Sequence, residues 1–531
     1  MRTVAVALLA AMACASPPDR ASGGTIVIAA TGSYGSLFPP MGGSATGRQI
    51  TELIYDYLTE VGLSLNTTDD RTFAPRLAES WEWARDSLSL AVHLHSTAKW
   101  HDGVPVRASD VAYSFSLYSD TSFSSMASQL ASIDSVTERD SLTAVFWFHA
   151  RYPLQFYDAT SQMQILPMHL YENIKVDSLR EAVANIKPVG TGRYRFASER
   201  PRESIELVAD SANYRGAPNI RRVIWRFFGS ADEAARALLA GEVDVYDAMR
   251  PGDVQAAAKV PDIKIAMSAG SDYAFMTFNL KRPLFASREL RRALAMAVDR
   301  DAMVSNVFDS LAFSGVGPTV RYFPTTSSSL RQIPYDPTRA ARILDSLGWR
   351  INSKTQIRTK NNQELRFKVI LPSSSSNRIR MGTLLQEQFR RIGVAIKLDQ
   401  MEFTTFNSRL YEHDFDAALA SWHLGTSPAS IRMLWTSNAS KNLGFYSNRT
   451  FDAQIDSAIS TFAPAASQQS YQSAYQTAID DAPAIWLYEP KLVIGIHKRI
   501  RTKPYRPDAW WWSLADWYIP PQEQIGRDRI Q

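Results

Sequence analysis

The chain has 531 residues, of which 45% are hydrophobic and 21% are charged, and its formal net charge is +5. One hydrophobic core usually serves no more than roughly 250–300 residues, so we expect at least two lobes. The mild charge, without a long run of Lys or Arg, argues against a nucleic-acid-binding protein.

The N-terminus has the pattern of an export signal. Arg2 gives a positive start, and Val4–Ala13 is an apolar block. This block is about half the ~20 residues that a membrane-spanning helix needs, which favours a signal peptide. We therefore predict a signal peptide over residues 1–13 and a small polar tether over residues 14–24.

Cys14 is the only cysteine of the chain, so an internal disulfide or a thiolate metal cluster is excluded. Ala11–Cys14 resembles a bacterial lipobox, in which the cysteine is lipidated and becomes the mature N-terminus. The resemblance implies a protein held by a lipid anchor in the bacterial cell envelope, in the periplasm or on the outer face of the membrane. Ordinary signal cleavage near Ala13 or Ala15 is the alternative.

Strand and helix patterns alternate along the rest of the chain. Alternating or continuous apolar runs predict strands at 25–30, 88–94, 141–148, 223–228, 243–245, 273–280, 366–371, 394–398, 416–421, 484–487, 492–496 and 510–519. Apolar residues at helical spacing predict helices at 50–58, 108–118, 153–171, 231–240, 288–298, 337–348 and 380–392. Helices between strands indicate an α/β protein with mixed sheets and crossover helices.

Several ordered motifs carry a family resemblance. Leu77–Tyr118 contains LAESW, a strand, the turn KWHDGVP and the helix start SDVAYSF; Pro188–Phe196 reads PVGTGRYRF, and FNLKRPLF begins at Phe278. In order and spacing these closely resemble the bacterial extracellular solute-binding proteins of the dipeptide/oligopeptide class, family 5, which deliver ligands to ABC importers. The resemblance covers nearly all of residues 25–520.

The resemblance implies a two-lobed periplasmic binding protein fold, type II and cluster C-like, with a hinge between the lobes. It implies that lobe I covers residues 25–272 with an inserted subdomain at about 57–185, that lobe II covers 273–485, and that 486–531 return to lobe I. We expect a monomer without a cofactor, whose partners are a peptide or peptide-sized ligand and the membrane permease subunits.

The resemblance also points to a ligand site after the strand at 416–421. Peptide-binding members carry a Trp-x-x-Asp-Tyr motif there, whose Trp packs on the ligand and whose Asp pairs with the peptide amino terminus. Here Trp422 is present, but Gly425 stands where the Asp would be. A buried ammonium without a carboxylate is costly, which leaves the ligand class open. The candidate ligand-binding residues are Tyr34, Tyr273, Trp422, His423, Gly425, Thr426 and Tyr488.

Three other interpretations have weaker support. His93 and His95 lie two apart on a predicted strand, but without a third ligand nearby we predict no metal site. The chain has no GxSxG, SxxK with its supporting motifs, or HExxH, so we do not expect an enzyme. An exported hydrolase, or a surface lipoprotein that presents ligand without transport, stays the alternative function.

Overall fold

The computed structural model describes residues 23–124 and 126–529. The predicted signal peptide, most of the tether and Cys14 therefore lie outside the described residues. Within the described part of the chain, none of the helices is long and apolar enough to cross a membrane.

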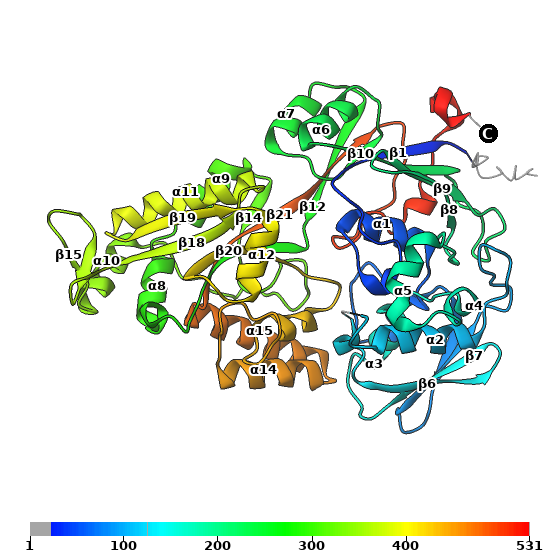
Figure 1. The fold of residues 1–531 in the computed structure, drawn as a ribbon, viewed down its shortest axis with the longest axis horizontal. Coiled ribbons are helices and arrows are strands. Elements are labelled where there is room, and N and C mark those ends of the chain that lie inside the picture. The colour runs from blue at the N-terminus through cyan, green and yellow to red at the C-terminus, as the bar shows by residue number, and fades with distance from the viewer. Residues whose placement is uncertain (1–22, 125, 530–531) are drawn as a thin grey trace, which may run out of the picture.

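A 12-stranded mixed sheet runs through two lobes and connects them (Figure 1). Its lobe I strands are β1 (Thr25–Thr31), β8 (Tyr194–Arg200), β9 (Ser204–Ala209), β10 (Arg222–Phe228), β11 (Val245–Tyr246) and β12 (Ile263–Ala269). Its lobe II strands are β13 (Asp272–Phe278), β14 (Ala312–Ser314), β18 (Arg366–Pro372), β19 (Ala395–Met401) and β20 (Ala417–His423). The long strand β21 (Ala484–His497) belongs to both. The expected mixed α/β, two-lobed fold is confirmed.

Strand β1 shows why a continuous apolar run lies at the centre of lobe I. It pairs in parallel with β10 on one side and β11 on the other. Val27 and Ala29 pack in the core that includes helix α6 (Ala231–Leu239), whereas Ile26 and Ile28 pack in the core that includes helix α1 (Ala45–Ile54). A parallel strand with both faces buried needs apolar residues at every position, as TIVIAA supplies.

The inserted part of lobe I forms a subdomain of its own. Strands β4 (Ala78–Trp83), β5 (Ser89–Leu94), β7 (Thr143–Phe148) and β6 (Ile133–Asp140) make an antiparallel sheet, and β2 (Thr59–Val61) pairs with β3 (Phe73–Pro75). The subdomain also holds helices α2 (Ala108–Ser119), α3 (Gln155–Ser161), α4 (Met168–Tyr171) and α5 (Val176–Ala182). The predicted WHDG turn is confirmed, since Gly103 has a φ of 92° and buried Trp100 donates to Asp110 at 3.2 Å.

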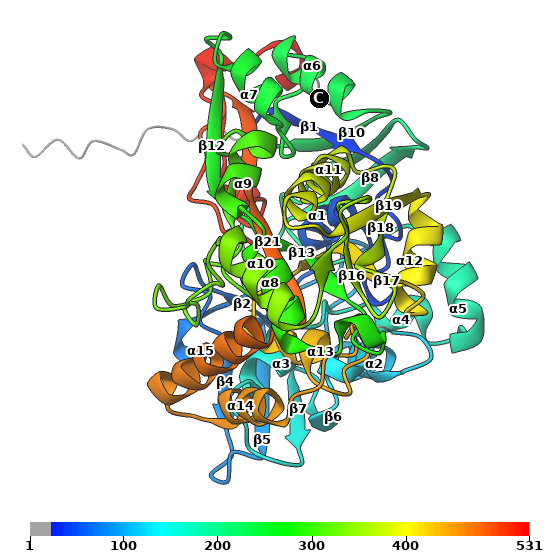
Figure 2. The ribbon, with the colours of Figure 1, turned by 90° about the vertical axis from the view of Figure 1, so that its left-hand side faces the viewer.

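Helices surround the lobe II part of the sheet (Figures 1 and 2). They are α8 (Arg288–Met296), α9 (Arg300–Phe308), α10 (Pro337–Ser346), α11 (Ser376–Arg391), α12 (Phe403–Tyr411), α13 (Ile431–Trp435), α14 (Arg449–Ser460) and α15 (Pro464–Asp481). A small sheet of β15 (Arg350–Ile351), β16 (Arg358–Lys360) and β17 (Gln363–Glu364) projects at the far end. Asp336 caps α10, as its Asp-Pro start predicts.

Two strand connections cross between the lobes. The chain passes from β12 to β13 through Gly270 and Ser271. Strand β21 pairs with β13 and β14 up to Pro490 and with β12 and β11 from Lys491 onward. The pairing partners of β21 thus change between Pro490 and Lys491.

Buried charges fasten the end of the chain to lobe I. The Arg499 guanidinium binds the carboxylate of Asp244 at 2.8 Å and also the carboxylate of Asp528. Asp528 in turn accepts from the backbone amide of Thr25, at the start of β1, at 2.7 Å. These groups are almost fully buried, so removing one partner would leave an uncompensated charge.

The strand predicted at 510–519 is wrong. This segment forms turns and the 3₁₀ helix η7 (Leu514–Asp516). A strand would turn Trp510 and Trp511 to opposite faces, but both are buried, and their indole N–H groups donate to Asp247 and Glu52, each at 2.8 Å. The hydrogen bonds of the two buried indole N–H groups therefore outweigh the preference of the aromatic residues for a strand.

Substitution of Gly270 tests how closely the two strands that cross between the lobes are packed. A Cβ at this position would overlap the carbonyl oxygen of Pro490, so Gly270→Ala must push the two crossing strands apart. We expect the variant to lose about 1–3 kcal/mol of stability, typical of overpacking, as a lower thermal unfolding midpoint. The matched control is Gly252→Ala in helix α7 (Pro251–Ala257), where an added Cβ meets no atom within 4 Å. Equal midpoints for both variants would contradict the steric role of Gly270.

Candidate ligand site between the lobes

A cavity of about 340 Å³ lies between the inserted subdomain of lobe I and the segment that follows β20 in lobe II. Its lobe I wall consists of Gln129, Ser132, Tyr152, Leu154, Tyr157, Asp158 and Gln162. Its lobe II wall includes Trp422, His423, Gly425, Thr426, Ser427 and residues of the following helical turns up to Lys441. The volume lies in the range of roughly 300–1,000 Å³ of small-molecule sites. We call it the central pocket.

The segment after β20 is held in place by the strand crossing. Strand β20 pairs with β13 up to Asp272 and His423. The Leu424 amide then donates to the carbonyl of Ser271 at 2.8 Å, and Leu424 itself is buried. The Tyr322 hydroxyl donates to the carbonyl of Gly425 at 2.8 Å. The pocket wall is therefore fixed to the point at which the chain passes between lobes.

Polar contacts join the two lobes beside this pocket. The Thr426 hydroxyl of lobe II donates to the Asp508 carboxylate of lobe I at 3.2 Å. An Arg48 guanidinium nitrogen lies 3.4 Å from Nε2 of His423, whose Nδ1 lies 3.1 Å from an Asp272 carboxylate oxygen. These contacts require the lobes to be close together, so they contribute only when the cleft is closed.

Asp508 is ionised despite its burial. It is 3% exposed, and Arg506 donates to its carboxylate at 2.7 Å. Burial alone would raise the pKa of Asp508, but Arg506 and Arg48 outweigh burial and lower that pKa below its usual value. Thr426 therefore donates to a charged acceptor, which makes a stronger hydrogen bond than a neutral one.

Helix α3 supplies the lobe I wall. In its sequence QFYDATS every residue except the last is buried. Asp158 is 8% exposed, and burial raises the pKa of its carboxyl to about 7, against the opposing effect of hydrogen bonds from Tyr152 and Gln162. A buried carboxyl group with a raised pKa thus lines the pocket.

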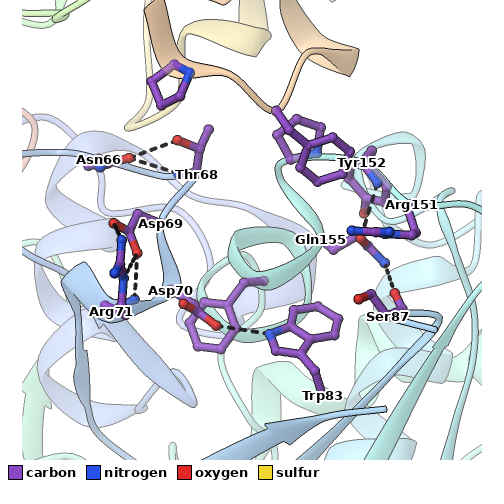
Figure 3. A pocket seen from close by; sticks show the side chains of 14 residues that line it. Asn66, Thr68, Asp69, Asp70, Arg71, Trp83, Ser87, Arg151, Tyr152 and Gln155 are labelled. Carbon is purple, nitrogen blue, oxygen red and sulfur yellow. Dashed lines mark hydrogen bonds and ion pairs between the residues drawn. The ribbon is translucent and has the colours of Figure 1, made fainter. Parts of the chain in front are cut away.

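Two further cavities continue the pocket along the lobe contact. One, of about 340 Å³, shares Leu154, Ser427 and Ile459 with the central pocket and extends to Tyr471 of α15. The next, of about 550 Å³, is bounded mainly by lobe I, with Phe462 and Pro464 of lobe II (Figure 3). The shared linings make one series of adjoining cavities between the lobes.

The outermost cavity has a rigid polar lining. Figure 3 shows the Trp83 indole donating to Asp70 and the Gln155 amide donating to the Ser87 carbonyl, each at 3.0 Å. The Arg151 guanidinium lies 5.4 Å from the ring centroid of Phe462, a cation–π contact between the lobes.

The structure brings four of the predicted site residues together. Trp422, His423, Gly425 and Thr426 all line the central pocket. Their contact with a ligand stays a prediction, but their common position at one interlobe cavity agrees with the expected site.

The three predicted tyrosines lie elsewhere. Tyr34 lines a separate cavity of about 480 Å³ within lobe I and donates to Glu199 at 2.5 Å. Tyr273 is 1% exposed and accepts from the Trp435 indole at 2.8 Å inside the lobe II core. Tyr488 is buried against Phe308, with ring centroids 4.4 Å apart. Tyr273 and Tyr488 are therefore packed in the core of lobe II.

Sequence reasoning did not single out Tyr152, Tyr157 or Asp158 for the pocket. Residues 153–171 were expected to form an apolar helix, whereas helix α3 ends at Ser161 and α4 begins at Met168. An Asp within the apolar run QFYDAT was the available signal, because buried carboxylates are rare without a partner or a role.

The described residues contain no group of three or more His, Cys, Asp or Glu side chains placed to hold a metal ion. His93 lies 3.2 Å from the Thr143 hydroxyl, and His95 packs against the ring of Tyr214. Each histidine therefore has a protein partner of its own.

Comparison with known proteins identifies the fold. Residues 72–443 match the family model of the bacterial extracellular solute-binding proteins, family 5 (middle region). The chain belongs to this family. Its members are binding proteins of transport systems and not enzymes, so this family-5 protein binds a solute without converting it.

Similar proteins cover almost the whole chain. The oligopeptide-binding protein AppA of Bacillus subtilis is 24% identical over 511 residues, covering 94% of this chain and 92% of AppA. The structure of AppA in complex with a nonapeptide gives a TM-score of 0.81 at 23% identity, covering 94% of this chain and 99% of that one. NikZ of Campylobacter jejuni, in complex with Ni(L-His), gives 0.79 at 23% identity, covering 93% and 99%. The fold is shared with proteins whose ligands differ widely.

Asp158 makes the stability of the protein depend on pH. Between about pH 4 and pH 7 this carboxyl is protonated in the folded state but ionised in the unfolded chain, so its contribution to stability falls as pH rises. The slope is about 1.4 kcal/mol per pH unit. Asp158→Asn removes this titration, so the unfolding midpoint of the variant should rise relative to that of the wild type from pH 4 to pH 7.

The charged and titratable groups that line the pocket together with Asp158 are Tyr152, Tyr157, His423, Arg432 and Lys441. All are retained in Asp158→Asn, so their own titration cancels in the comparison. The exposed Asp177→Asn in α5 is the control and should show no such trend. A pH-independent difference between wild type and Asp158→Asn would contradict the raised pKa.

Proposed function

We propose that the protein is the substrate-binding component of an ABC importer. It captures a peptide or peptide-sized solute between its lobes and delivers it to a membrane permease. The observation that supports this most directly is the series of adjoining cavities along the lobe contact, with the Trp422–Thr426 segment at its inner end. An elongated ligand fits a series of cavities better than a single compact site.

The comparisons support the same ligand class. AppA, which covers 94% of this chain, is named an oligopeptide-binding protein, and its structure holds a nonapeptide. NikZ, which has the same fold, is in complex with Ni(L-His), so the fold alone does not specify a peptide. Trp422, His423, Gly425 and Thr426 are the proposed ligand contacts of the central pocket.

The N-terminal sequence supports an exported protein. An apolar block ending before Cys14 and a short polar tether fit a lipoprotein held at the cell envelope by its acylated cysteine, where it would meet the permease subunits as a monomer. Stable anchoring needs more than one acyl chain, because a single chain binds only marginally.

Closure of the two lobes around the ligand contributes to the free energy of binding. A micromolar affinity corresponds to about 8 kcal/mol. A largely dry cleft supplies apolar contact, and the bonds of Thr426 to Asp508 and of Arg48 to His423 form only when the lobes meet. A ligand that fills the cavities thereby favours the closed state, which the permease would recognise.

Native mass spectrometry of the purified protein tests the function. We expect one small organic molecule per chain, released unchanged on denaturation. A bound metal ion alone, or an empty protein after exposure to a peptide-rich medium, would count against a peptide carrier. A chemically converted ligand would favour the exported hydrolase, and a ligand-loaded protein without transport in a strain that carries the permease would favour a presenting lipoprotein.

The bond between Thr426 and Asp508 can be removed without a change of shape. Thr426→Val keeps the side-chain volume but leaves Asp508 without this donor, so the closed state loses about 1.5–3 kcal/mol, the usual worth of a hydrogen bond to a charged group. We expect an affinity for unblocked tripeptides that is weaker by roughly 10- to 150-fold in isothermal titration. Thr450→Val, at an exposed position of α14, serves as control. Unchanged affinity in Thr426→Val would show that this bond does not assist closure.

A further inference from the structure

The central pocket contains a buried carboxylate without a cationic partner. Asp158 is 8% exposed, and among the ion pairs of residues 23–124 and 126–529 none includes it. Its described neighbours are polar but neutral: the Gln162 amide donates over a long 3.4 Å, and the Tyr152 side chain lines the same pocket. An ionised carboxylate in such a place is costly until a positive charge joins it.

The opposite wall supplies no free acid. Its segment WHLGTS contains Gly425 but no Asp or Glu. Two carboxylates contact this segment, and both already have partners in the protein: Asp508 accepts from Arg506 and Thr426, and Asp272 lies beside His423. An ammonium group in the pocket can therefore find its counter-charge only on helix α3.

The two basic residues that line the pocket, Arg432 and Lys441, make no ion pair with Asp158. Arg432 is 59% exposed in its side chain and pairs with Asp456 at 3.2 Å. Lys441 is an exposed residue on the same lobe II wall. Both basic residues lie at exposed positions of lobe II, whereas Asp158 is buried in lobe I. The Asp158 carboxylate therefore lines the pocket without a paired cation.

We propose that Asp158 is the anionic contact for a positively charged amino group of the ligand, so that the protein selects peptides or peptide-like compounds with a free amine. This inference rests on the proposed function and specifies its ligand class. The amine approaches Asp158 from the cavity and supplies the positive charge that this carboxylate lacks in the free protein. The free-energy cost of burying the carboxylate is therefore offset only when the ligand is bound. Because Asp158 belongs to lobe I and Trp422 to lobe II, a ligand held by both joins the lobes.

The structure offers a second position for the same charge. A Cβ at Gly425 meets no atom within 4 Å, and its backbone is outside the left-handed region that favours glycine. Gly425→Asp therefore places a carboxylate on the lobe II wall of the same pocket without a steric clash. If the pocket needs a negative charge for the ligand amine, this change should compensate for the loss of Asp158.

The test uses two synthetic tripeptide libraries of identical composition, one with free amino termini and one N-acetylated. Binding to the full chain, freed of co-purified ligand, is measured by native mass spectrometry and isothermal titration. For the wild type we expect at least about tenfold tighter binding of the free-amine library, the usual worth of a hydrogen bond to a charged group. Asp158→Asn should abolish this preference, and Asp158→Asn with Gly425→Asp should restore part of it. Asp177→Asn, the same change on an exposed position of the same subdomain, should behave like the wild type.

The outcomes separate the inference from the function. If the wild type binds both libraries equally, or if Asp158→Asn keeps the preference, the role of Asp158 is overturned while peptide binding stands. If the wild type binds neither library, the peptide function fails and the inference with it. Near-ultraviolet circular dichroism shows whether Asp158→Asn folds. If it does not, the wild-type comparison of the two libraries still decides, because a preference for the free amine supports the proposal and the absence of a preference refutes it.

Discussion

Two peptide strands cross between the lobes side by side, and the space between them leaves no room for a side chain at Gly270. The carbonyl oxygen of Pro490 occupies the position that a Cβ at Gly270 would take, while β21 exchanges its pairing partners at the same point. Ser271, the next residue, accepts from Leu424 and thereby fixes the wall that carries Trp422 and Thr426. The geometry of the candidate site is thus set at the crossing.

The charges around the cleft are distributed unevenly. Asp508 is buried but satisfied by Arg506, so its burial costs little and it can accept from Thr426 when the lobes meet. Asp158 is equally buried and has no cation. Asp508 thus takes part in the contact that forms when the lobes close. Asp158 has no positively charged partner within the described residues, and we propose that the ligand supplies one.

The sequence predicted most of the fold because its local signals agree with one another. Asp336 before Pro337 and the period-two pattern before Trp100 each have one simple structural solution, and the structure adopts it. The segment 510–519 was misread because indole groups of Trp510 and Trp511 find acceptors that lie far away in sequence, Asp247 and Glu52. Asp158 was overlooked for the same reason: its importance depends on which lobe II segment faces it, and no local pattern reveals that. The predicted lobe boundaries and ligand contacts stay predictions.

The central claim is that the two lobes close over a guest molecule. Small-angle X-ray scattering of the ligand-free protein and of the same sample saturated with a free-amine tripeptide library measures this most directly. We predict that the radius of gyration decreases on saturation and that the scattering profile changes from an open to a closed two-lobed shape. An unchanged radius of gyration, with saturation confirmed by titration of the same sample, would contradict closure.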